Sequence, residues 1–111
     1  MMNLMEINGY SAVIKYDPEI EMLRGEFIGL NGSADFYANN IEDLKKEGAI
    51  SLKIFVDACQ KRNIEPRKKY SGKVNVRVPS KLHANITSAA IAEGKSLNRW
   101  VVDTLDNAAQ L

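Results

Sequence analysis

The chain has 111 residues, of which 45% are hydrophobic and 26% charged, so it suffices for one ordinary domain or two small ones and is too apolar for wholesale disorder. No segment approaches the ~18 apolar residues of a membrane span, and the first ten residues lack the pattern of a secretory signal. The single cysteine, Cys59, excludes an internal disulfide framework and an all-cysteine metal cluster. We therefore expect a cytoplasmic protein that does not bind a membrane.

Charge is unevenly divided along the chain, although the net charge is only +1. Residues 1–60 contain five Lys or Arg against ten Asp or Glu, whereas residues 61–111 contain ten against four. Such asymmetry indicates different partners for the two halves, and nucleic acid is the first candidate for the basic half. The alternative is chance clustering of charge.

The first third of the chain predicts an antiparallel meander. β-Branched and aromatic residues alternate loosely over residues 10–16, and "DPEIEM" at 17–22 contains turn-forming residues. Residues 23–30 predict the returning strand, "NGS" at 31–33 is a strong turn signal, and residues 34–38 predict a third short strand. We therefore expect three consecutive strands joined by turns.

Helical spacing replaces this alternation between residues 40 and 63. Asn40 is a suitable helix cap, whereas Gly48 and Ser51 leave open whether the segment forms one helix or two. An amphipathic stripe here would cover one face of the sheet and give a compact α+β domain over residues 1–63. The apolar positions of this stripe are Ile41, Leu44, Leu52, Phe55, Val56 and Cys59.

A linker and a smaller unit follow. Residues 64–72 contain a proline, a glycine and four charges, which predicts a linker. In "KVNVRVPSKLH" (73–83), three valines alternate with polar residues in the period of a β-strand until Pro79 stops the run. Two helices are expected next, the first closing at Gly94 and the second capped by Ser96.

This smaller unit, residues 73–111, predicts a dimer. One strand and two helices of about 39 residues lie below the ~40 residues at which a domain usually needs disulfides, metal or oligomerisation. With no disulfide available, the strand can pair with the same strand of a second copy, giving a two-stranded ribbon over four helices and an isologous two-fold interface. The expected dimer core comprises Val74, Val76, Val78, Leu82, Ile86, Leu97, Trp100, Val101 and Leu105.

The polar face of such a ribbon predicts DNA binding. A two-stranded ribbon fits the major groove, where Arg reads guanine and Asn reads adenine through bidentate hydrogen bonds. The expected base-reading residues are Lys73, Asn75 and Arg77. The amides, hydroxyl and cations at the start of the last helix suit a phosphate oxygen. The expected phosphate-binding residues are Lys95, Ser96, Leu97, Asn98 and Arg99. The alternative is a solvated edge strand whose cations prevent aggregation.

Two stretches carry a resemblance to known families. "NVRVPSKLH", followed by "AEGKSLNRWVVDTL", resembles the ribbon-helix-helix (Arc/MetJ-like) DNA-binding family, whose members are dimers that read the major groove. With "AVIKYDPEIEMLRGEFIGL" and "RKKYSGKVNVRVPSKLH", the chain as a whole resembles a HicB-type antitoxin. The resemblance implies a reduced RNase H-like domain that binds a small mRNA-cleaving toxin, HicA, and a C-terminal module that represses the shared promoter.

The resemblance also implies a set of partners. We expect a homodimer, with a tetramer as the alternative, that binds double-stranded operator DNA and a small basic HicA-like toxin. The acidic first half suits a basic, RNA-binding partner. The candidate toxin-binding residues are Asp17, Glu19, Glu21 and Glu26. We expect no enzymatic activity, no catalytic residue, no metal site and no cofactor.

Two other functions compete with this interpretation. The first is a stand-alone ribbon-helix-helix repressor whose N-terminal domain senses a ligand or builds higher oligomers. The second is a nuclease, which would need several carboxylates converging on two metal ions. Because the acidic residues follow one turn and its flanking strands, we expect a solvated hairpin instead. His83 is expected on the surface, and Cys59 is expected to pack as a small hydrophobe.

Overall fold

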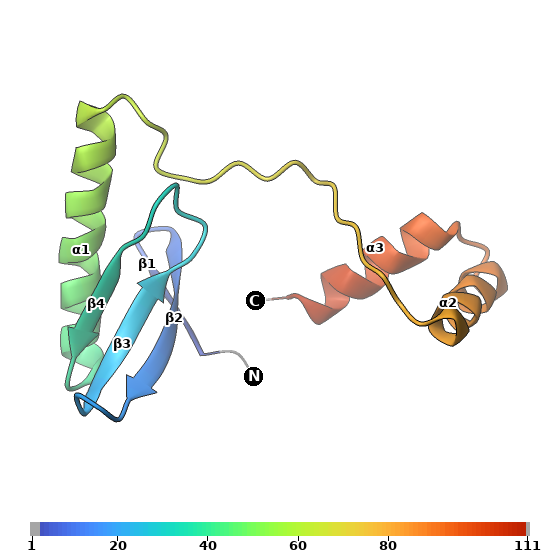
Figure 1. The fold of residues 1–111 in the computed structure, drawn as a ribbon, viewed down its shortest axis with the longest axis horizontal. Coiled ribbons are helices and arrows are strands. Elements are labelled where there is room, and N and C mark those ends of the chain that lie inside the picture. The colour runs from blue at the N-terminus through green and yellow to red at the C-terminus, as the bar shows by residue number, and fades with distance from the viewer. Residues whose placement is uncertain (1–2, 111) are drawn as a thin grey trace. The chain divides into compact units, whose positions relative to one another are not determined.

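The computed structural model describes residues 3–110, and within them the protein is α+β, with a four-stranded antiparallel sheet and three helices (Figure 1). The chain divides into two compact units, the first ending at Ser71 and the second beginning at Gly72. The elements are β1 (Leu4–Ile7), β2 (Tyr10–Asp17), β3 (Met22–Phe27), β4 (Asp35–Ala38), α1 (Ile41–Lys61), α2 (Ser80–Ala92) and α3 (Leu97–Ala108).

The first unit is an antiparallel meander covered by one helix. Its strands lie in the order β1-β2-β3-β4, and α1 packs along one face of the sheet (Figure 1). Phe27 and Phe36, from neighbouring strands, pack with ring centroids 5.0 Å apart. The buried core comprises Ile7, Ala12, Phe27, Leu30, Phe36, Ala38, Leu44 and Leu52. The three predicted strands are confirmed, although β3 ends at Phe27 rather than at residue 30.

Strand β1 was not predicted, and it pairs with β2 from Leu4↔Val13 to Ile7↔Tyr10. The connecting residues Asn8 and Gly9 both have positive φ, 49° and 83°, as a two-residue type I′ hairpin turn requires. The Asn-Gly dipeptide is itself a hairpin signal, so the strand was predictable from its turn.

Helix α1 is one continuous helix, and Asn40 caps it by accepting a hydrogen bond from the Asp43 N–H at 2.8 Å. Gly48 does not interrupt it but is buried where the helix crosses the sheet. A Cβ at this position would collide with the side chains of Ile7 and Phe36. The close approach of helix and sheet therefore favours glycine at this position despite its unfavourable helix propensity.

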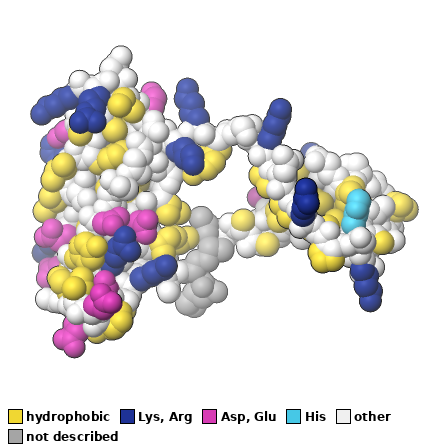
Figure 2. All heavy atoms as spheres, in the orientation of Figure 1, with side chains coloured by type: hydrophobic (Ala, Val, Ile, Leu, Met, Phe, Trp, Pro, Cys, Tyr) yellow, Lys and Arg dark blue, Asp and Glu magenta, His cyan; other side chains and the backbone are white. Residues whose placement is uncertain are grey.

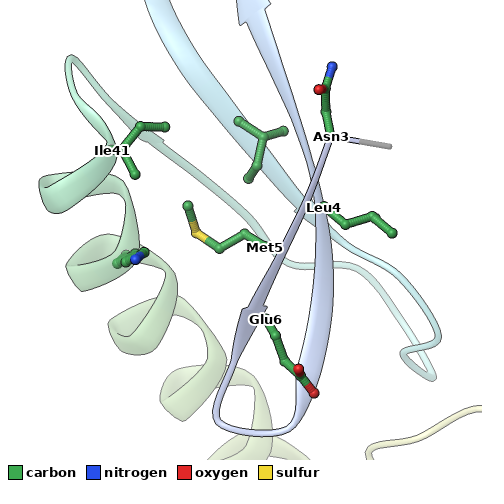
Figure 3. Close-up of a pocket in the computed structure, with 7 residues that line it drawn as sticks. Asn3, Leu4, Met5, Glu6 and Ile41 are labelled. Atoms are coloured by element: carbon green, nitrogen blue, oxygen red, sulfur yellow. The ribbon is translucent and has the colours of Figure 1, made fainter. Parts of the chain in front are cut away.

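The predicted apolar stripe of α1 is confirmed along the helix but is wrong for its first residue. Leu44, Leu52 and Cys59 are buried, whereas Ile41 is 48% exposed. Ile41 lies where α1 begins, beside β1, and lines a groove of about 520 Å³ between the two elements. Figure 3 shows Met5 directed toward α1 across this groove. Ile41 therefore stays in contact with solvent, whereas Leu44, three residues later, is fully buried.

The beginning of the predicted linker, residues 64–72, is attached to the first unit. An antiparallel bridge joins Leu30 to Arg67. The Arg67 guanidinium donates to the Gly9 carbonyl oxygen at 2.9 Å and lies 3.8 Å from the centre of the Tyr10 ring. A charged hydrogen bond and a cation–π contact thus hold this part of the chain against the β1–β2 hairpin.

The second unit consists of an extended segment and two helices. Gly94 follows α2 with φ of +70°, which confirms the predicted left-handed C-terminal position. The Ser96 hydroxyl caps α3 by accepting a hydrogen bond from the Arg99 N–H at 3.1 Å, also as predicted. Within residues 72–110, Ala90 is the one buried residue. Taken alone, this unit therefore has almost no hydrophobic core.

Candidate nucleic-acid interface

The segment expected to form a strand, residues 73–78, lies outside every helix and strand described between residues 3 and 110. It is a stretch of chain that leads to α2 (Figure 1). Val74 and Val76 are 77% and 72% exposed, and Val78 is 39% exposed. Such alternating, exposed valines are unusual for a stable single chain and leave a large apolar area available for burial.

The polar residues of this segment are also accessible. Lys73, Asn75 and Arg77 alternate with the valines, and all three are exposed. Successive residues of an extended chain point to opposite sides, so the sequence pattern divides this segment into an apolar and a polar side. This division is what a ribbon in the major groove requires, with one side in a core and the other toward base edges.

The remaining positions of the expected dimer core lie on the two helices. Leu82 and Leu105 are 44% and 53% exposed. The other four are partly buried: Ile86, Leu97, Trp100 and Val101. None of these helix residues is fully buried in the single chain, although α3 is amphipathic. The two helices therefore present an incomplete apolar surface to solvent.

The expected phosphate site lies at the start of α3. The amides of Leu97 and Asn98 belong to the first turn, where helix N–H groups lack carbonyl partners within the helix. Ser96 uses its oxygen as the helix cap. Its hydroxyl hydrogen and the first-turn amides can thus donate to a phosphate oxygen.

The cations of this site are engaged with carboxylates. The Lys95 ammonium lies 2.9 Å from a carboxylate oxygen of Asp103 and 3.8 Å from Glu93. The Arg99 guanidinium lies 3.5 Å from the second oxygen of Asp103. Glu93 also accepts a hydrogen bond from the Trp100 indole. We refer to Glu93, Lys95, Arg99 and Asp103 as the loop cluster.

The ion pairs of the loop cluster affect proton binding. The hydrogen bond from Lys95, together with its charge, lowers the pKa of Asp103 below its ordinary value. The same hydrogen bond raises the pKa of Lys95. Neither carboxylate of the cluster was predicted from the sequence. The spacing of four residues between Arg99 and Asp103 on one helix was the available signal.

The candidate toxin-binding acids do not form one cluster. Asp17 ends β2, and its carboxylate accepts the Glu19 N–H at 3.0 Å within the β2–β3 turn, which also contains Glu21. Glu26 lies on β3 and is 3.8 Å from the Arg24 guanidinium. The turn therefore presents three of the four acids, and the fourth belongs to an ion-pair group on the sheet.

Other chemical sites are not apparent in residues 3–110. No group of three or more His, Cys, Asp or Glu in that range could hold a metal ion. His83 is exposed on α2, and Cys59 is buried in α1, as expected for both. No described helix is long and apolar enough to cross a membrane. Figure 2 shows acidic side chains gathered on the first unit, whereas Lys and Arg dominate the visible charges of the second.

Comparison with known proteins gives one match. The model of the HicB family matches residues 55–105, just under half of the chain, from the second half of α1 through the exposed segment and α2 into α3. No curated protein and no solved structure gives a significant match. The family match covers the whole candidate nucleic-acid interface and supports the HicB-type resemblance of this chain.

Proposed function

We propose that this protein is the antitoxin of a type II toxin–antitoxin pair, which neutralises a small HicA-like mRNA-cleaving toxin and represses its own operon by binding DNA in the major groove. The observation that carries the proposal is the HicB family match over residues 55–105. The opposite charges of the two halves of the chain add independent support, because they suit a basic protein and nucleic acid.

The second unit would act as a ribbon-helix-helix dimer. Its valines at 74, 76 and 78 are exposed in the single chain, and Ala90 is its one buried residue within 72–110. A unit of this size with so little buried area is not expected to fold alone. Pairing residues 73–78 with their copy in a second chain would bury the valines and place the polar side chains outward.

In the dimer, Asn75 and Arg77 would read base edges, together with Lys73. Two copies of each would contact the two halves of an inverted repeat, since protein two-fold symmetry is mirrored in operator symmetry. The first turn of α3 would hold the DNA backbone through the Leu97 and Asn98 amides. Phosphate contacts of this kind fix register, whereas the ribbon supplies sequence preference.

The first unit would bind the toxin. Its β2–β3 turn is acidic and contains Ile20, which is 50% exposed, and Tyr16 near the end of β2 is 60% exposed. Apolar residues surrounded by carboxylates suit the surface of a cationic protein, with charge giving fast association and the apolar contacts giving affinity. We therefore retain Asp17, Glu19 and Glu21 as candidate contacts, with Glu26 at the margin of the surface.

DNA binding by the ribbon is tested with the fragment upstream of the gene for this chain, by fluorescence anisotropy. Arg77→Ala should lose ~1–3 kcal/mol for each bidentate contact and relax sequence preference. Arg62→Ala, at the end of α1, removes the same charge outside the proposed interface and should bind as the wild type does. Equal binding by both variants would show that the ribbon does not read the operator.

A further inference from the structure

We propose that Asp103 masks the cations Lys95 and Arg99 at the start of α3. This masking would lower the affinity of the protein for DNA that is bound without regard to sequence. The inference rests on the proposed DNA-binding function. It assigns to Asp103 a regulatory role in that function, which is distinct from contacting DNA.

The geometry of the loop cluster carries the inference. Both oxygens of the Asp103 carboxylate are used, one by Lys95 at 2.9 Å and the other by Arg99 at 3.5 Å. Lys95 is further held by Glu93 at 3.8 Å. A single carboxylate thus engages both cations that flank the Ser96 cap, where a phosphate would bind.

The loop cluster is electrically neutral as a whole. It contains two cations, Lys95 and Arg99, and two carboxylates, Glu93 and Asp103. A phosphate at the start of α3 would therefore meet the helix amides but no net positive charge. To gain a cation, the phosphate must displace Asp103 from it, and the carboxylate that remains nearby repels the phosphate.

The two cations differ in how firmly they are held. The Lys95 side chain is 35% exposed and lies between two carboxylates, whereas the Arg99 side chain is 65% exposed and forms the longer contact. Long contacts between exposed side chains contribute little. Lys95 is therefore masked more completely, and Arg99 is the cation more readily released to DNA.

The consequence concerns binding that does not depend on sequence. Such binding comes almost wholly from cations that neutralise phosphates and release counterions. Masking two cations in each subunit weakens this contribution and leaves the base contacts of the ribbon a larger share of the total. Asp103 would thus keep the protein from occupying DNA that lacks the operator.

The test uses the full-length protein and a random-sequence duplex of about 20 base pairs, over roughly 0.05–0.3 M salt. Asp103→Asn keeps the shape of the side chain and removes its charge. Asp106→Asn is the matched control, because it changes the net charge equally, lies on the same helix and is in none of the three ion pairs of the cluster. Circular dichroism and light scattering check that each variant is folded and has the wild-type oligomeric state.

We expect Asp103→Asn to bind the random duplex about tenfold more tightly than the wild type. The slope of log affinity against log salt should be steeper by about two, because Arg99 gains one phosphate contact in each subunit while Glu93 still holds Lys95. Asp106→Asn should stay within about twofold of the wild type. In the wild-type background Lys95→Gln should also change binding by less than about twofold, because the lysine is already masked. This second variant provides a test even where Asp103→Asn does not fold.

Four results would overturn the inference. If the wild type binds DNA and the two Asp→Asn variants bind it equally well, only the net charge of the protein affects its affinity for DNA. Weaker binding by Asp103→Asn, or a large loss with Lys95→Gln, would show that the carboxylate orients the cations toward DNA. If neither the wild type nor any variant binds DNA even at the lowest salt, the proposed function itself fails, and the inference fails with it.

Discussion

Replacing Val76 by Asp should abolish the proposed dimer. Val76 is 72% exposed in the single chain, so most of its side chain remains to be buried by a second copy. Full burial of a valine contributes about 1.5–3 kcal/mol, and the two-fold axis doubles it to about 3–6 kcal/mol. Loss of that burial alone raises the dissociation constant about 10²–10⁴-fold, since each 1.4 kcal/mol is a factor of ten. An unpaired carboxylate in the core adds a further penalty.

The measurement is sedimentation equilibrium of the wild type and two variants. Val102→Asp introduces the same charge at a valine of α3 that is 45% exposed and outside the expected dimer core. We expect Val102→Asp to stay dimeric and Val76→Asp to sediment as a monomer without DNA binding. A Val76→Asp protein that remains a dimer would refute pairing through residues 73–78.

The remaining predictions concern packing and protonation. Gly48→Ala should lower the free energy of unfolding measured by urea denaturation. Overpacking against Ile7 and Phe36 costs about 1–3 kcal/mol, which outweighs a helix-propensity gain of about 1 kcal/mol. A more stable variant would contradict the close packing. The Asp103 carboxyl should titrate below 3.8 by NMR, and Lys95→Gln should return it toward 3.8. Because folding lowers this pKa, the ion pair stabilises the folded protein above about pH 3.8, and this stabilisation is lost as the pH falls through the pKa of the folded state. An NMR titration midpoint of Asp103 that is unchanged in Lys95→Gln would contradict the ion pair.

The helices and most of the sheet could be predicted because their signals are local. Neighbouring residues alone determine the helix caps and the left-handed position, which are Asn40, Ser96 and Gly94. The hairpin turn at Asn8-Gly9 is local too, but the strand it introduces has four residues and was overlooked. Local chemistry therefore accounts for the element order of the first unit and for the two helices of the second, whereas residues 73–78, expected to form a strand, lie in no strand of the described chain.

The features that were not predictable depend on tertiary contacts. Gly48 looks like a helix interruption until Ile7 and Phe36, from distant strands, are placed against it. Likewise, the sequence marks Lys95 as a phosphate ligand, but the fold places it against Asp103, eight residues later. Packing distance and ion-pair geometry are properties of the folded unit, so sequence periodicity does not contain them.

The proposed function of this chain is the neutralisation of a small basic toxin. It is tested most directly by recovering the tagged, full-length protein from its native host after nuclease treatment and measuring the intact complexes by native mass spectrometry. We predict a stoichiometric complex with a basic protein smaller than the 12.4 kDa chain, which separately arrests growth and cleaves mRNA, and which loses both effects when this chain is added. Recovery of the chain only with copies of itself would contradict the antitoxin function and favour a stand-alone repressor.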